Sequence, residues 1–279
     1  MTATAHILAS GPGWRVTDIV CTAGPDDRAF EEAHPQHCIA IVRSGSFRYR
    51  SKQGSAVLAP GSLLLGNRGA CFECGHEHAA GDRCLAFQFE PAWLEGVVTA
   101  VPGARQISFA QAHLPALALL AGVIAEAEIA ADEPERLEET ALRLAGAVTS
   151  VLSGAKPGSA TPSTRDQHRI TRALRHIETH CEDALSIDEL ARHAAMSPYH
   201  FLRTFRALVG MTPHQYVLRT RLHRAALLLR RTDLSVAGIA FDCGFGDLST
   251  FNRRFKRVMG LNPSEYRAPE RPRQRFAQR

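Results

Sequence analysis

Arg203 and Arg253 occupy equivalent positions in two copies of one sequence pattern near the C-terminus. The first copy runs from Ser186 to Tyr216 and the second from Ser235 to Tyr266. A guanidinium group can donate two parallel hydrogen bonds to the N7 and O6 atoms of guanine, and it also binds phosphate. Two such arginines at matching positions of a repeat therefore indicate contact with a nucleic acid.

The elements that must position these arginines follow from the repeat. Each copy predicts a short helix, a tight turn and a second helix with a basic outer face, which is the outline of a helix-turn-helix DNA reader. Ser186 and Thr212, with Glu189 and Gln215 three residues later, predict capping boxes at two helix starts. The expected core face of the two recognition helices consists of Phe201, Thr204, Phe205 and Leu208, and of Phe251, Phe255 and Val258.

The opposite face of each recognition helix carries the candidate DNA contacts. Arg203 and Arg253 are expected at guanine, Asn252 at adenine and Leu202 at a thymine methyl group. The complete predicted set is Tyr199, Leu202, Arg203, Arg206, Ser249, Thr250, Asn252, Arg253, Lys256 and Arg257.

A single helix is predicted from Pro213 to Arg231, between the two copies. At about 1.5 Å per residue it would span about 28 Å, and one turn of B-DNA is about 34 Å. One chain can therefore present both recognition helices to successive segments of the major groove.

Charge is distributed unevenly along the chain. Residues 165–279 contain 21 Lys and Arg against 11 Asp and Glu, a net charge of +10. The whole chain carries +5, so residues 1–164 carry −5. Almost all the basic side chains are arginines, since the chain has only three lysines. This excess favours double-stranded DNA as the partner of the C-terminal half.

The segment CFECGHEHAAGDRC holds a second set of reactive side chains. A Cys-x-x-Cys followed by His-x-His could bind Zn²⁺ or another transition metal. It could also form a thiol sensor, if a nearby cation lowers a cysteine pKa. The remaining alternative is a set of buried strand and loop residues without a ligand. The residues concerned are Cys71, Cys74, His76, His78 and Cys84, with His34 and His37 upstream.

The remainder of the chain predicts two domains. Short strands separated by Gly and Pro up to about residue 110 indicate a small barrel or jelly roll. Helical spacing of Ala, Leu and Glu predicts helices within 113–153. We expect an effector and dimerisation domain at 1–155, a Gly/Ser/Pro/Thr linker at 156–164 and a DNA-binding domain at 165–279.

The C-terminal half resembles the AraC/XylS family of bacterial transcription regulators over about a third of the chain. The resemblance implies a multidomain α+β protein with a cupin-like N-terminal β-barrel and following helices, and an all-α double helix-turn-helix domain. It implies a transcription activator that responds to a small-molecule effector, acts with RNA polymerase and forms a homodimer. The residues that carry it include Ser197-Pro198, Arg203, Phe205, Gly210, Pro213, Arg221, Gly244-Phe245, Arg253, Phe255-Lys256, Gly260, Pro263 and Tyr266-Arg267.

Other function classes are less well supported by the residues. No run of apolar residues reaches the ~18 that a membrane helix requires, the N-terminus lacks the layout of a secretory signal, and we expect a cytoplasmic protein. An odd number of cysteines, seven, favours reduced thiols. We expect no enzyme activity and no cofactor other than the candidate metal. The alternatives are a metal- or thiol-based stress sensor and a cupin-type oxygenase fused to a DNA-binding domain.

Overall fold

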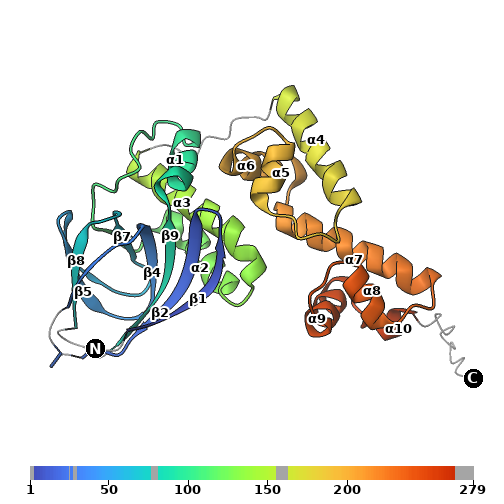
Figure 1. The fold of residues 1–279 in the computed structure, drawn as a ribbon, viewed down its shortest axis with the longest axis horizontal. Helices are drawn as coiled ribbons and strands as arrows, with labels where there is room; N and C mark the ends of the chain where they lie inside the picture. Colours follow the sequence, from blue (N-terminus) through green and yellow to red (C-terminus); the bar gives the residue numbers. More distant parts are fainter. Residues whose placement is uncertain (1–2, 25, 28–29, 77–80, 155–162, 268–279) are drawn as a thin grey trace, which may run out of the picture.

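The computed structural model describes residues 3–24, 26–27, 30–76, 81–154 and 163–267. Strands form a barrel at one end of an elongated molecule, and helices α4 to α10 form the other end (Figure 1). Helices α1 to α3 lie between the two and cover one side of the barrel (Figure 1). Within the described residues, no helix has the length and apolar character needed to cross a lipid bilayer.

Two antiparallel sheets make up the barrel. The six-stranded sheet has the order β1 (Ala3–Gly11), β2 (Trp14–Cys21), β9 (Asp82–Phe89), β4 (His37–Gly45), β7 (Leu63–Gly66) and β10 (His113–Leu114). The four-stranded sheet has the order β3 (Phe30–Ala33), β8 (Cys71–Gly75), β5 (Phe47–Ser51) and β6 (Gly54–Leu58). The alternating sequence SFRYR predicts a strand with Phe47 and Tyr49 on one face, and this is confirmed in β5, where both residues are buried.

Alternation along β9 separates two apolar cores. Cys84 and Ala86 face the interior between the sheets, whereas Leu85 and Phe87 pack toward the helices on the outer face. These helices are α1 (Pro91–Ala100), α2 (Ala118–Ala130) and α3 (Leu137–Leu152), with the short 3-10 turn η1 (Pro134–Arg136) before α3.

The sequence predicts the strands that became β4, β5, β6, β7 and β9, and the two helices that became α2 and α3. Strands β1, β2, β3, β8 and β10 and helix α1 were not identified. Helix α1 lies in a region expected to be mainly strand, although Pro91 at its first position is a helix-start signal.

The C-terminal half consists of seven helices in the described residues. Their bounds are α4 (Thr164–Thr179), α5 (Ile187–His193), α6 (Pro198–Val209), α7 (Pro213–Arg231), α8 (Val236–Asp242), α9 (Leu248–Met259) and α10 (Pro263–Arg267). Helix α7 has the predicted bounds, and Thr212 and Gln215 form the predicted capping box at its start. At α5, Ser186 accepts the Glu189 amide hydrogen bond, which is one half of the predicted box.

The two helix-turn-helix copies differ in what they pack against. The core of the second copy, around Phe251 and Phe255, is a separate cluster. The core of the first copy, around Phe201 and Phe205, belongs to the same cluster as the barrel helices. The first copy is therefore joined to the N-terminal half by continuous apolar packing.

The turn of the second copy depends on a glycine. Gly244 has a φ of +81°, and a Cβ atom there would lie 2.4 Å from the Glu182 carbonyl oxygen. We predict that Gly244→Ala lowers the free energy of unfolding by about 2 kcal/mol or more, because it adds a left-handed strain and a backbone clash. Urea denaturation measures the loss. Gly246→Ala, at a position with open space, is the control, and an equal loss in both variants would contradict the prediction.

Candidate nucleic-acid interface and barrel cavity

The second recognition helix, α9, presents its predicted contacts to solvent. Ser249, Arg253, Lys256 and Arg257 are exposed, and Thr250 and Asn252 are half-buried. The N-cap Asp247 accepts a hydrogen bond of 2.7 Å from the Thr250 amide, and this backbone bond lowers the pKa of the Asp247 carboxyl. Val258, expected in the core, is 52% exposed, so that part of the predicted core face is wrong.

The first recognition helix, α6, is arranged differently. Leu202 is only 3% exposed and belongs to the apolar cluster shared with the barrel helices, which contradicts its predicted outward position. The Tyr199 ring packs against α3 at Gly146, where an added Cβ atom would lie 2.0 Å from the ring. Arg206 remains exposed and Arg203 is half-buried, while Leu208, predicted for the core, is 37% exposed.

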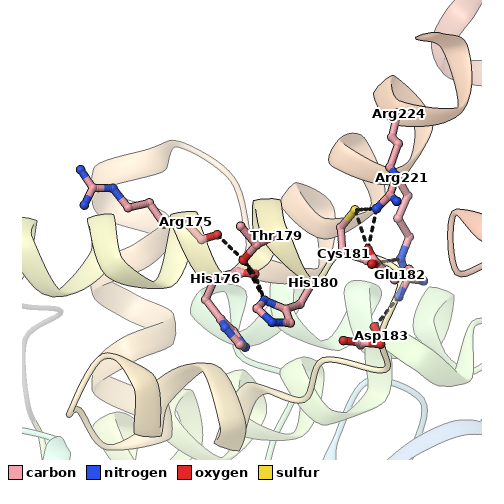
Figure 2. Close-up of polar contacts among 9 residues, drawn as sticks. All are labelled: Arg175, His176, Thr179, His180, Cys181, Glu182, Asp183, Arg221 and Arg224. Carbon is pink, nitrogen blue, oxygen red and sulfur yellow. Dashed lines mark hydrogen bonds and ion pairs between the residues drawn. The ribbon is translucent and has the colours of Figure 1, made fainter. Parts of the chain in front are cut away.

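One arginine joins the segment before the first helix-turn-helix copy to the turn of the second copy. Arg221 extends from α7 and donates hydrogen bonds to the Cys181 and Asp183 carbonyl oxygens, at 2.5 and 2.8 Å (Figure 2). It also donates a 2.8 Å bond to the Gly244 carbonyl oxygen in the turn of the second copy. The neighbouring Arg224 forms an ion pair of 2.6 Å with Glu182 (Figure 2). Because one rigid guanidinium group bonds both the α4–α5 connection and the turn of the second copy, the position of that turn relative to this connection is restricted.

Two consecutive glutamates at the start of α3 contact helix N-termini of the DNA-binding half. Glu138 accepts a 3.0 Å hydrogen bond from the amide of Ile187, the first residue of α5. Glu139 lies against the Thr212 hydroxyl and the His214 amide at the start of α7. A helix N-terminus carries a partial positive charge and unpaired amides, so it attracts a carboxylate.

Burial opposes the charge on Glu139. It raises the pKa of the Glu139 carboxyl to about 7, although hydrogen bonds from Thr212 and His214 partly compensate. Its Oε1 atom is buried and has no hydrogen-bond partner among the described residues. Burial also lowers the pKa of the neighbouring His214 to about 4. Burial therefore makes the ionised form of Glu139 unfavourable at neutral pH.

A buried ion pair connects α9 to the N-terminal half. Arg254 is 6% exposed, lies 3.4 Å from Glu133, and also pairs with Glu135. Burial alone would raise the pKa of Glu135, but its own backbone bond and the Arg254 charge outweigh it and lower that pKa. The sequence analysis missed Arg254. Its position three residues after Phe251, on the core side of α9, is a signal that could have revealed it.

A cavity of about 560 Å³ remains between the start of α3 and the two helix-turn-helix copies. Residues of both halves line it, among them Glu138, Glu139, His214 and Arg254. The two halves therefore meet through apolar packing at α6 and separate polar contacts elsewhere, with unfilled space between.

The cysteine and histidine segment does not form one cluster. Cys71 is exposed, whereas Cys74, His76 and Cys84 are buried, and His78 lies outside the described residues. Burial raises the pKa values of the Cys74 and Cys84 thiols, which reduces their thiolate fraction at neutral pH. His76 instead meets Asp82, at 2.6 Å, and Cys21. Neither partner was in the predicted set.

A second cavity, of about 170 Å³, lies inside the barrel and is mainly apolar. The aromatic residues of the predicted strands favour a small organic effector in the barrel near Phe47, Tyr49 and Phe87; of these, Phe47 lines the cavity, whereas Phe87 packs on the helix side of the sheet. Tyr49 is fully buried and its hydroxyl lies 2.9 Å from His34 Nε2. Burial lowers the pKa of His34 to about 4, so its imidazole is neutral at physiological pH.

Comparison with known proteins matches the C-terminal and N-terminal halves of the chain to two different domain families. A family described as "Helix-turn-helix domain" matches residues 190–269, and one described as "AraC-like ligand binding domain" matches residues 19–146. The HTH-type transcriptional activator AarP of Providencia stuartii is 38% identical over 98 residues, 35% of this chain and 73% of AarP. The chain belongs to the AraC family. It is a DNA-binding transcription regulator with an AraC-like ligand-binding domain.

Two further AraC-type proteins show the extent of the similarity. The HTH-type transcriptional regulator Rv1931c of Mycobacterium tuberculosis is 47% identical over 81 residues, 29% of this chain. The matched part is only 31% of Rv1931c. The DNA-binding domain of AdpA, solved with a target DNA, is 33% identical, with 38% of this chain and 91% of that chain covered and a TM-score of 0.33.

Arg203 and Arg253 are expected to read bases in the AraC-type domain. In the fragment 163–279, Arg203→Ala and Arg253→Ala should each weaken binding to a selected specific site by roughly 1–3 kcal/mol and relax preference at one base position. Arg257→Ala should weaken specific and random DNA equally. Fluorescence anisotropy on both DNAs measures this, and an equal loss on both for Arg203→Ala would assign Arg203 to phosphate.

Glu139 should make stability depend on pH. Because its pKa in the folded protein lies above the ordinary value, the folded state binds the proton more tightly. The destabilising effect is absent at low pH and grows as pH rises from about 4.5 to 7. Glu139→Gln should therefore exceed the wild type in stability at pH 8 by roughly 1–3 kcal/mol, and match it at low pH.

Denaturation at both pH values tests the Glu139 prediction. Glu95→Gln, at an exposed position of α1, serves as the control and should show no such difference. A Glu139→Gln protein that is less stable than the wild type at pH 8 would show that the anion is required at the α7 N-terminus.

Proposed function

We propose that this regulator is an effector-responsive transcription activator whose N-terminal domain controls access of α6 to DNA. The observation that carries the proposal is the packing of Tyr199 and Leu202 against the N-terminal half. Both residues are predicted DNA contacts. In this arrangement α9 can meet the major groove with Arg253, while α6 cannot bring its predicted face to a base edge.

The polar contacts support the same proposal. The N-terminal half is acidic and the C-terminal half is basic. Glu133, Glu135, Glu138 and Glu139 all contact the DNA-binding half. Glu138 and Glu139 lie at helix N-termini, and Glu133 and Glu135 pair with the buried Arg254. These contacts would help to hold the DNA-binding half in the arrangement in which α6 packs on α3.

In this proposal, binding of the effector triggers the release of α6. Binding in the barrel would act on α3, which contacts both β1 and β2 of the barrel and α6 of the DNA-binding half. Release of α6 would then allow both copies to occupy one DNA site. We further propose that the released form recruits RNA polymerase and that the N-terminal domain forms the homodimer, as the family resemblance implies.

Gly146→Val tests the control of α6 directly. The new side chain would occupy the position of the Tyr199 ring and separate α6 from α3. We predict that full-length Gly146→Val binds a specific site with the affinity of fragment 163–279, at least tenfold more tightly than the wild type. Its footprint should cover two half-sites where the effector-free wild type protects one.

Gly122→Val is the matched control. Gly122 lies on α2 with open space around it, so valine there should leave DNA affinity unchanged. Thermal unfolding of both variants verifies that they are folded. A folded Gly146→Val protein with wild-type affinity and footprint would refute the proposed control.

A further inference from the structure

Three metal-binding side chains converge at one end of the barrel. Cys21 ends β2, Asp82 begins β9, and the two residues are direct partners in the six-stranded sheet. His76 follows β8 of the other sheet. The Cys21 sulfur, a His76 ring nitrogen and an Asp82 carboxylate oxygen all lie within 4.8 Å of one another.

This group is buried. Cys21 is 7% exposed and His76 is 5% exposed, and the Asp82 side chain is 7% exposed. All three also line the 170 Å³ barrel cavity, together with Cys74 and Cys84. The Cys84 sulfur lies 3.3 Å from Asp82 Oδ1, so a second thiol adjoins the same carboxylate.

We propose that Cys21, His76 and Asp82 bind a divalent transition metal ion of the Zn²⁺ type, with Cys84 as the fourth donor. Thiolate, imidazole and carboxylate are the ligands of tetrahedral zinc, at about 2.3, 2.0 and 2.1 Å. Donors at those lengths around one tetrahedral ion are about 3.3–3.7 Å apart. The Cys21, His76 and Asp82 donors already lie within 4.8 Å of one another and need only small movements, whereas Cys84 adjoins Asp82 and must move further to bind. The donor atoms do not suit Ca²⁺ or Mg²⁺, because these ions bind mainly oxygen and the site offers sulfur and nitrogen.

Charge and protons balance in this step. The proton in the hydrogen bond between His76 Nε2 and Asp82 Oδ2 moves to His76 Nδ1, or to solvent if Nδ1 already carries one, and both freed atoms then bind the ion. The Cys21 thiol, and Cys84 where it binds, each release one proton to solvent as the S–metal bond forms. No electron is transferred. Because protons are released, affinity should increase with pH.

This site differs from the Cys-x-x-Cys and His-x-His set expected from the sequence. Cys71 points to solvent and is not part of it. A second group, His176, Glu189 and His193, lies on the DNA-binding half and contains no sulfur. The inference goes beyond the proposed function, since the ion would bind whether or not DNA affinity responds.

Co²⁺ binding to the chelator-treated, reduced full-length protein tests the inference. Sulfur ligation gives a thiolate-to-cobalt charge-transfer band, and we expect one equivalent of Co²⁺ to produce it and Zn²⁺ to displace it. Cys21→Ser and His76→Gln should each weaken binding at least tenfold. Cys71→Ser and His193→Gln should retain the wild-type band.

X-ray absorption of the zinc-loaded wild-type protein keeps the test decisive if a variant fails to fold. We expect sulfur scattering at about 2.3 Å together with nitrogen or oxygen. Zinc should also raise the melting temperature by mass action. A zinc shell without sulfur, a charge-transfer band that survives in folded Cys21→Ser, or a band lost in Cys71→Ser would overturn the proposal.

Discussion

The packing of Tyr199 on Gly146 is the contact on which the arrangement of the two halves depends. Gly146 has no side chain, and the space beside it on α3 is filled by the ring of Tyr199, a predicted DNA contact on the first recognition helix. Leu202, one turn further along α6, completes the contact and joins the cores of the two halves. The second recognition helix makes no comparable apolar contact, because its core is a separate cluster. The first copy of the motif is therefore held to the N-terminal half by apolar packing, and the second copy is not.

The polar contacts add specificity to this packing. Arg221, on the helix between the two copies, bonds the α4–α5 connection and the turn of the second copy through three carbonyl oxygens. Glu138, Glu139 and the Arg254 ion pairs then hold the joined copies against α3 and η1. Such buried ionic groups add little net stability but penalise alternative arrangements. The raised pKa of Glu139 is the sign of that penalty.

Local signals in the sequence predicted most of the helical half. The bounds of α7 follow from Thr212, Pro213 and Gln215, which act within one helical turn. Leu202 was predicted to face outward but is buried, because it packs against the N-terminal half, a contact that helical phase within α6 does not reveal. Leu208 and Val258 were predicted for the core but are 37% and 52% exposed. The cluster of Cys21, His76 and Asp82 depends on strand register between distant segments. Spacing along the chain cannot reveal such a register.

A distance measured between α2 and α6 tests the central claim most directly. Spin labels at Ala125 and Ala207, both exposed, can be introduced as cysteines after Cys71, the exposed native thiol, is replaced by serine. Double electron–electron resonance of the full-length protein should give one narrow distance without DNA and a longer one in a complex whose footprint covers both half-sites. An unchanged distance in a complex whose affinity depends on Arg203 would contradict the account.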